Sequence, residues 1–284
     1  MFFFLFFLFN VFGHQRISKL YESIVVSYGR EKVEKFLVFV AVAGFLILTG
    51  WIVLASFRRY KNLLQPCKML SLWFIAVLLC YGAYGFLICS KVEIVHFPQY
   101  AILAFWGMFL IRDTARTVFI VTFLGIFDET FNYIFHSRFT PYLDLNDMVL
   151  NFCGALVGTV FYHTVIDEMP LTMDHWAFKL GYVLVFLIVA LIIVGIVTGK
   201  IVLENTLADP TTPLQNGQFI LSFQHYEPFW RYTSAGVRYH IMTPVEGILL
   251  IGTLLSAVHA VCSFFTRQNY DKNIRHFATL PRMI

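Results

Sequence analysis

The sequence predicts an all-α protein, a polytopic transmembrane helical bundle. Of its 284 residues, 58% are hydrophobic and 13% are charged, and the mean hydropathy is +0.71. A soluble domain carries roughly twice that charged fraction. Several apolar runs reach the length of roughly 20 residues that a helix needs to cross a bilayer, and the short alternating segments of a barrel are not seen. We therefore expect a single integral membrane domain over residues 1–284, with about seven spans and a short N-terminal Phe-rich segment.

The first 35 residues form two expected segments. Residues 1–13, MFFFLFFLFNVFG, are apolar but too short to span comfortably. They lack the basic start and the small-residue cleavage site of a signal peptide. We expect an uncleaved helix there, either interfacial or partly buried. Residues 14–35 mix charged and apolar side chains, which is typical of an amphipathic segment on the membrane surface.

The spans and their connections then set the topology. The expected spans are 36–57, 69–90, 97–111, 117–135, 147–166, 178–198 and 244–266. Basic residues gather in the 58–68 loop, in the 112–116 link and in the C-terminal tail, which share one side when seven spans are counted. Cytoplasmic loops carry an excess of Lys and Arg, so that side is expected to be cytoplasmic. The basic residues between 16 and 35 then lie outside, against the rule.

A polar stretch, 199–243, is expected to be an extracytoplasmic loop. Asn216-Gly217 is a hairpin turn signal and precedes QFILSF. The segment HYEPFWRY, which includes Trp230 and Arg231, is aromatic-rich. Such loops most often anchor at the membrane interface. The alternative is a lid over a polar site.

The five cysteines are expected to be packing residues, because none forms a CxxC pair or lies beside a histidine at ligand spacing. We predict neither a structural disulfide nor a cysteine-bound metal.

Polar side chains recur inside membrane-like sequence between residues 91 and 158. An ionisable residue in or beside a transmembrane helix is expensive, which makes it a candidate functional residue. The expected topology brings the residues of three helix ends to the same, outer side. The candidates are Glu93, His96, Asp128, Glu129, Arg138, Asp144, Asp147 and Asn151.

Roles follow from residue chemistry. His96 with Asp128 or Glu129 could serve as a catalytic acid/base pair. Arg138 suits recognition of phosphate or carboxylate. The remaining candidates are assigned to substrate binding: Glu93, Asp144, Asp147 and Asn151.

Two alternatives stay open for the same residues. The charged groups could form an internal ion-pair network that holds three helices together. A Glu, His and Asp set could also ligate a divalent metal. No HExxH or comparable ligand motif is present, so we predict no metal and no other cofactor.

A helix-packing stripe follows these residues. Asp147, Asn151, Gly154 and Gly158 fall at i, i+4, i+7 and i+11, which is one face of a helix. Gly154-x-x-x-Gly158 lets another helix approach closely. The stripe is therefore predicted to face protein rather than lipid.

These residues resemble the VanZ-like family of bacterial membrane proteins, over residues 91–166. The family's segments are E/K-x-x-H-x-x-x-Y, DE-x-x-Q, a G/S-R turn and D-x-x-D-x-x-x-N-x-x-G-x-x-x-G. The matching residues are Glu93, His96 and Tyr100, then Asp128 and Glu129, then Ser137-Arg138, then Asp144, Asp147, Asn151, Gly154 and Gly158. Asn132 stands where the family usually has Gln, so a direct contact from that shorter amide is in doubt.

The resemblance implies a multi-pass protein of the bacterial inner membrane with a role in the cell envelope. The family is named after an accessory factor in resistance to the glycopeptide teicoplanin. The leading hypothesis is a site that binds or processes the polar head of a lipid or lipid-linked precursor. The alternative is a non-enzymatic subunit of a larger membrane complex. A proton-relay transporter is disfavoured, because we find neither broken helices nor paired repeats. The expected partners are membrane lipids or membrane-protein subunits, and not nucleic acid.

Overall fold

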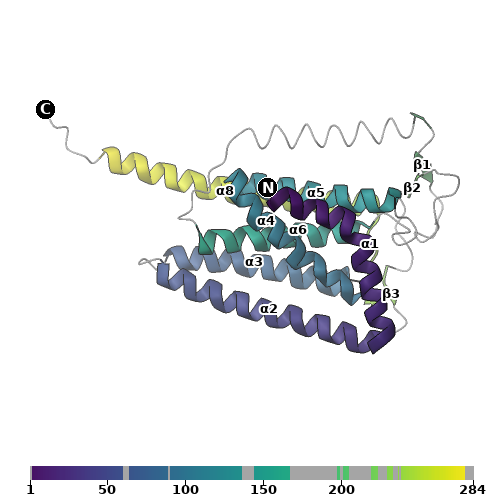
Figure 1. Cartoon of the computed structure of the whole chain (residues 1–284). Helices are drawn as coiled ribbons and strands as arrows, with labels where there is room; N and C mark the ends of the chain where they lie inside the picture. The colour runs from purple at the N-terminus through teal and green to yellow at the C-terminus, as the bar shows by residue number, and fades with distance from the viewer. Residues whose placement is uncertain are drawn as a thin grey trace.

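The computed structural model describes residues 2–59, 64–88, 90–135, 144–166, 197–198, 201–204, 219–222, 229–232, 236 and 238–278. This part of the chain is mostly helical, as predicted (Figure 1). Its helices are α1 (Phe2–Tyr28), α2 (Arg30–Arg59), α3 (Leu64–Phe86), the 3₁₀ helix η1 (Lys91–Val95), α4 (His96–Ile111), α5 (Thr114–Phe135), α6 (Leu145–Val165) and α8 (Pro244–Ala278).

Five of the described helices are long and apolar enough to cross a membrane. They are Arg30–Arg58, Met69–Phe86, Lys91–Ile111, Leu145–Val165 and Val245–Cys262. The predicted 117–135 span forms α5, which carries Asp128 and Glu129 and is not among the five. The predicted 178–198 span lies almost wholly outside the described residues. A membrane protein is thus supported by five helices, while the count of seven stays a prediction.

The N-terminal helices divide at a different place from the one predicted. α1 runs unbroken through residue 13, and α2 begins at Arg30, six residues before the expected start of the first span. The break falls at Gly29, whose φ of +84° is left-handed, a conformation that glycine adopts without a Cβ clash. The predicted boundaries at 13/14 and 35/36 are therefore wrong, because they followed composition rather than backbone geometry.

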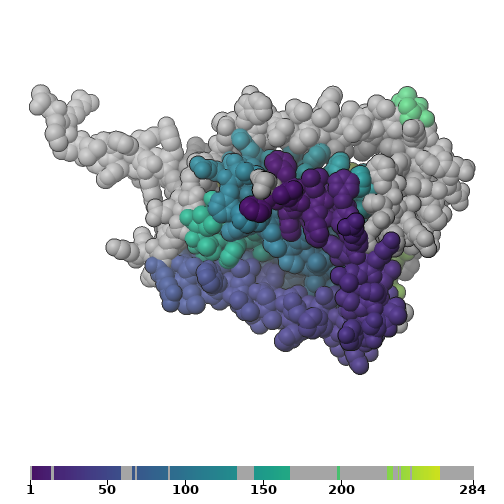
Figure 2. Space-filling model, in the orientation of Figure 1, coloured from purple at the N-terminus to yellow at the C-terminus, as the bar shows by residue number. Residues whose placement is uncertain are grey.

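The Phe-rich start packs on the bundle along one side only. Phe2 stacks on Trp106 of α4, and Phe12 meets Phe131 of α5 edge to face. Phe3 is buried, whereas Phe2 and Phe12 are exposed, in agreement with a partly buried helix. Figure 2 shows this helix lying on the outer face of the bundle. The second half of α1 then crosses the end of the bundle to reach α2 (Figure 1).

α6 is the central helix. In the apolar stretch of α6, 83% of the residues are buried, whereas in the apolar stretch of α2, at the edge of the bundle, 6% are buried. α6 packs on α3, α4 and α5. Small residues such as Gly154, Ala155 and Thr159 let these neighbours approach closely. The exposed apolar face of α2, which includes Phe39 and Trp51, is the surface expected of a helix in lipid.

Several helix termini meet at one end of this bundle. α3 and α5 end there, and α4, α6 and α8 begin there (Figure 1). Asn146 of α6 joins the segment after α3 to the segment before α8, since its amide nitrogen donates to the carbonyls of Leu87 (2.9 Å) and His240 (2.7 Å) and its oxygen accepts from the Met242 amide (3.1 Å). The C-terminal end of α2, the start of α3 and the link between α4 and α5 lie at the opposite end. The predicted convergence of three helix ends is therefore observed.

The long loop holds short strands. β1 (Ile201–Glu204) pairs in parallel with β2 (Phe219–Ser222), and β3 (Arg231–Tyr232) pairs antiparallel with β4 (Arg238–Tyr239). A tight hairpin at Asn216-Gly217 cannot produce the parallel pair, because parallel strands need a longer crossover. The turn residues themselves lie outside the described part of the chain. Trp230 packs on Phe86 at the end of α3, which fixes this part of the loop to the bundle.

Candidate functional site

The turn before α4 positions His96. η1 begins after Ser90, whose backbone N–H donates to Glu93 Oε1 at 2.9 Å in a capping box. His96 then follows as the first residue of α4 and is buried. Glu93, predicted to bind substrate, is thus engaged in holding the turn that presents His96.

Asp144 has a similar role at the start of α6. It is the N-cap residue, and its side chain accepts from the backbone N–H groups of Asn146 (3.0 Å) and Asp147 (3.2 Å). A carboxylate at this position satisfies helix N–H groups that have no intrahelical partner. Asp144 therefore holds the start of α6 beside Asp147, and its role in contacting substrate stays a prediction.

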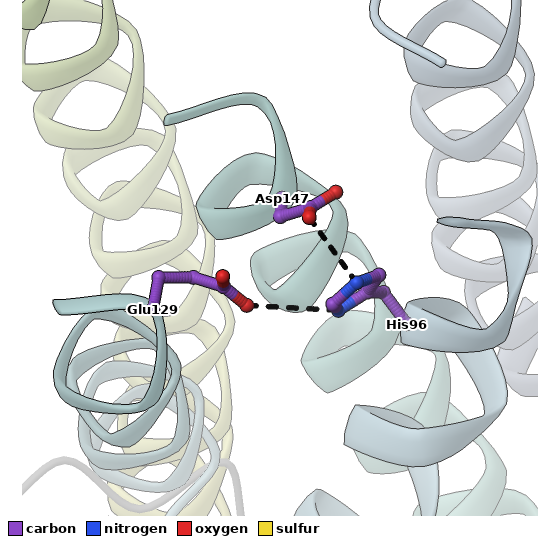
Figure 3. Close-up of side chains that lie close together, drawn as sticks. All are labelled: His96, Glu129 and Asp147. Atoms are coloured by element: carbon purple, nitrogen blue, oxygen red, sulfur yellow. Dashed lines mark ion pairs between the residues drawn. The ribbon is translucent and has the colours of Figure 1, made fainter. Parts of the chain in front are cut away.

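Three helices bring His96, Glu129 and Asp147 together (Figure 3). His96 Nε2 lies 3.3 Å from Asp147 Oδ2, and His96 Nδ1 lies 4.0 Å from Glu129 Oε1. His96 Nδ1 is also 2.8 Å from Asn151 Oδ1. Because an amide oxygen only accepts, Nδ1 carries a proton and Nε2 faces Asp147. We call these four residues the His96 cluster.

Several polar atoms of the His96 cluster are buried without a hydrogen bond to any described residue. They are Glu129 Oε1, Asp147 Oδ1 and Asn151 Nδ2. Glu129 is only 1% exposed. A buried polar group left unpaired costs about 1–3 kcal/mol, and more when it is charged. Such atoms are retained where a ligand completes their bonding, so the cluster has the chemistry of a binding site.

Asp128 occupies a separate position beside the cluster. Tyr100 Oη donates to Asp128 Oδ2 at 2.8 Å, and Asn132 Nδ2 donates to Asp128 Oδ1 at 3.0 Å. Of the two predicted catalytic partners of His96, Glu129 lies 4.0 Å from its Nδ1, and Asp147, at 3.3 Å from Nε2, is closer still. The short Asn132 side chain reaches the carboxylate one helical turn away.

Close helix packing holds the cluster together. An added Cβ at Gly154 would lie 2.7 Å from the carbonyl oxygen of Phe97, and one at Gly158 would lie 2.8 Å from the carbonyl carbon of Ala101. The two glycines thus sit directly on the α4 backbone. Gly125 of α5, which was not predicted from the sequence, lies against the Asn151 side chain, where an added Cβ would be 2.9 Å away. Its signal was a small residue one turn before Asp128.

Arg138, predicted to bind an anionic group, falls outside the described residues, and its role stays a prediction. Asn146, whose contacts join α3, α6 and the start of α8, was not singled out from the sequence. In the sequence, the signal is an amide residue two positions after Asp144, at the start of a predicted span.

An apolar cavity of about 900 Å³ lies next to the first turn of α4. Its walls come from α2, α3, α4 and α6 and are almost wholly aliphatic or aromatic, with Phe45, Trp51, Tyr84, Phe97 and Phe105 among them. Lys91 Nζ lies 4.6 Å above the ring of Tyr84, and Lys91 forms no ion pair with any described residue. The cavity therefore has a basic side chain beside it, at the end of the bundle where His96 lies.

Comparisons of the chain with protein-family models, with curated proteins and with solved structures found no match. The geometry of the helix ends is thus the basis for any functional conclusion.

Proposed function

We propose that this chain is a VanZ-like membrane protein of the bacterial cell envelope that binds, at the His96 cluster, the polar head group of a lipid or lipid-linked precursor. The observation that carries the proposal is the set of His96 and Glu129, both buried, with the partly buried Asp147, in which carboxylate oxygens have no described hydrogen-bond partner. Structural packing alone does not account for such atoms, since each destabilises the fold.

The adjoining cavity supports a lipid rather than a water-soluble ligand. Its walls suit an acyl or isoprenoid chain, because they offer hydrocarbon and almost no polar surface. Phe97 and Pro98 line the cavity and directly follow His96 in the chain. A chain in the cavity would bring its head group to the start of α4, where Lys91 and His96 lie five residues apart.

The location of the basic loops supports an outer-side site. The C-terminal end of α2, which carries Arg58 and Arg59, and the Arg112 to Arg116 link lie at the end of the bundle opposite His96. Under the positive-inside rule, that basic end is cytoplasmic. The His96 cluster then faces the outer leaflet, where envelope precursors are used.

The test is lipid retention measured by native mass spectrometry after purification in mild detergent. The wild-type chain is expected to keep a bound lipid that the Asp147→Asn and Glu129→Gln variants lose. His240→Gln is the matched control, because His240 pairs with Glu246 at 3.2 Å at the same end of the bundle but outside the cluster.

Equal lipid retention in all four proteins would refute the proposal. A stoichiometric protein partner in place of lipid would favour the alternative of a non-enzymatic subunit.

A further inference from the structure

We infer that His96, Glu129 and Asp147 bind a divalent transition-metal cation of the zinc or manganese class. Each residue offers one ligand atom, and these atoms lie within 4.8 Å of one another. They come from α4, α5 and α6, and Figure 3 shows the three side chains pointing toward a common centre. The expectation from the sequence was that no metal binds, because no local ligand motif is present.

The distances suit a cation after a small adjustment. Zinc lies about 2.0–2.2 Å from nitrogen and oxygen ligands, so neighbouring ligand atoms in a tetrahedral site are about 3.4 Å apart. His96 Nε2 and Asp147 Oδ2 are already 3.3 Å apart. Glu129 Oε1 is farther from the imidazole, 4.0 Å from its Nδ1. The candidate ligand atoms all lie within 4.8 Å of one another, so a rotation of the Glu129 side chain that moves its carboxylate toward Nε2 by up to about 1.4 Å would complete the site.

The imidazole is oriented as a metal ligand. His96 Nδ1–H donates a hydrogen bond to Asn151 Oδ1 at 2.8 Å, so Nε2 is the nitrogen that faces Asp147. Metal-binding histidines usually donate their other N–H to an oxygen in this way, which fixes the tautomer and the ring. Asn151 would therefore be a positioning residue.

Charge provides an independent argument. Glu129 and Asp147 are two carboxylates in a buried site, and each has one oxygen without a described hydrogen-bond partner. A protonated His96 would pair well with Asp147 only, because Glu129 Oε1 stays at 4.0 Å. A divalent cation neutralises both carboxylates and gives Glu129 Oε1 a ligand bond. Burying an uncompensated carboxylate is costly, so the cation also stabilises the fold.

The donor set selects the metal. One imidazole nitrogen and two carboxylate oxygens suit zinc or manganese, whereas calcium and magnesium prefer all-oxygen sites. Three protein ligands leave a coordination position open for a further oxygen. A phosphate of the head group would fill that position, and the cation would offset its repulsion from the two carboxylates. This bridging role rests on the proposed function, whereas cation binding itself does not.

The experiment measures binding of the metal alone. The protein is purified in mild detergent without a histidine tag, stripped with a chelator and titrated with ZnCl₂ and MnCl₂ by equilibrium dialysis with elemental analysis. We expect saturation at about one cation per chain, and a loss of affinity of at least tenfold in Glu129→Gln and His96→Gln. His163→Gln is the matched control, since His163 is a buried α6 histidine that contacts Thr114 outside the cluster. Its affinity should equal that of the wild type.

Absence of saturable binding by the wild type, or unchanged affinity in Glu129→Gln, would overturn the inference. Glu129→Gln keeps the side-chain volume, and its circular dichroism spectrum checks the fold. If His96→Gln does not fold, Asp147→Asn serves as the second ligand variant. Lipid retention is measured on the same samples. Metal binding without a bound lipid would refute the proposed function alone, and lipid without metal would refute this inference alone.

Discussion

The contact between α4 and α6 makes a quantitative prediction for Gly158→Ala. The added Cβ would lie 2.8 Å from the carbonyl carbon and 2.9 Å from the Cα of Ala101, where ordinary contact begins at 3.4 Å. Both atoms belong to the backbone, so no side-chain rotation relieves the clash. The carbonyl oxygen of Ala101 lies closer still, so the two helices must separate by more than the roughly 0.6 Å that the carbon contact alone requires.

The energetic cost can be bounded. Overpacking costs about 1–3 kcal/mol, and contact with backbone favours the upper value. Alanine gains about 1 kcal/mol over glycine in a helix, which offsets part of that cost. We therefore expect Gly158→Ala to lower the free energy of unfolding by about 2 kcal/mol. The same movement would lengthen the 3.3 Å contact between His96 and Asp147, since these residues lie on the two helices that separate.

Unfolding by SDS in mixed micelles, followed by far-UV circular dichroism, measures this difference. Gly44→Ala is the matched control, because Gly44 lies within α2 and nothing is within 4 Å of its added Cβ. That variant should match the wild type or gain stability by up to about 1 kcal/mol. If both variants unfold at the same SDS fraction, the argument from close helix packing is wrong.

Three further predictions concern single contacts. Asn146→Ala should lower the free energy of unfolding by about 2–4 kcal/mol, because two buried carbonyls and one backbone amide lose their partner. Faster hydrogen exchange at residues 241–243 is the measurement that checks this. Normal exchange there would contradict the role of this amide as a tie between segments. Tyr100→Phe should lower the free energy of unfolding by about 1.5–3 kcal/mol, because the hydrogen bond to Asp128 is lost. The same SDS titration measures this, and an unchanged midpoint would show that the hydrogen bond contributes nothing to stability. In a Cys89→Ser background, the exposed Cys67 at the basic end should react with a membrane-impermeant maleimide in inside-out vesicles only, and labelling of right-side-out vesicles would contradict the orientation.

The sequence located the candidate site because charge is conspicuous in apolar runs. His96, Glu129, Asp147 and Asn151 were all selected from this contrast, and the described structure gathers them at one end of the bundle. The approximate helix limits in this region followed from the same local signal. The predicted helix boundaries near the N-terminus were wrong, because the composition changes at residue 13 whereas the helix ends at Gly29.

Residue roles, in contrast, depended on contacts that no local pattern contains. Asp128 and Glu129 are adjacent in sequence, yet one accepts from Tyr100 and the other faces His96. Consecutive residues of a helix point about 100° apart, so the rotation of α5 against its neighbours decides which carboxylate enters the cluster. Asp144 was predicted to bind substrate, and the structure adds that its side chain caps the start of α6.

The sequence by itself thus determined a helical membrane bundle and the residue types of its polar end. Tertiary structure alone decided that imidazole and carboxylates from three helices lie within 4.8 Å, because only packed helices bring residues 96, 129 and 147 together. The physical reason is that hydropathy and helix propensity act along the chain, whereas a site for a ligand depends on distances between helices that glycine contacts set.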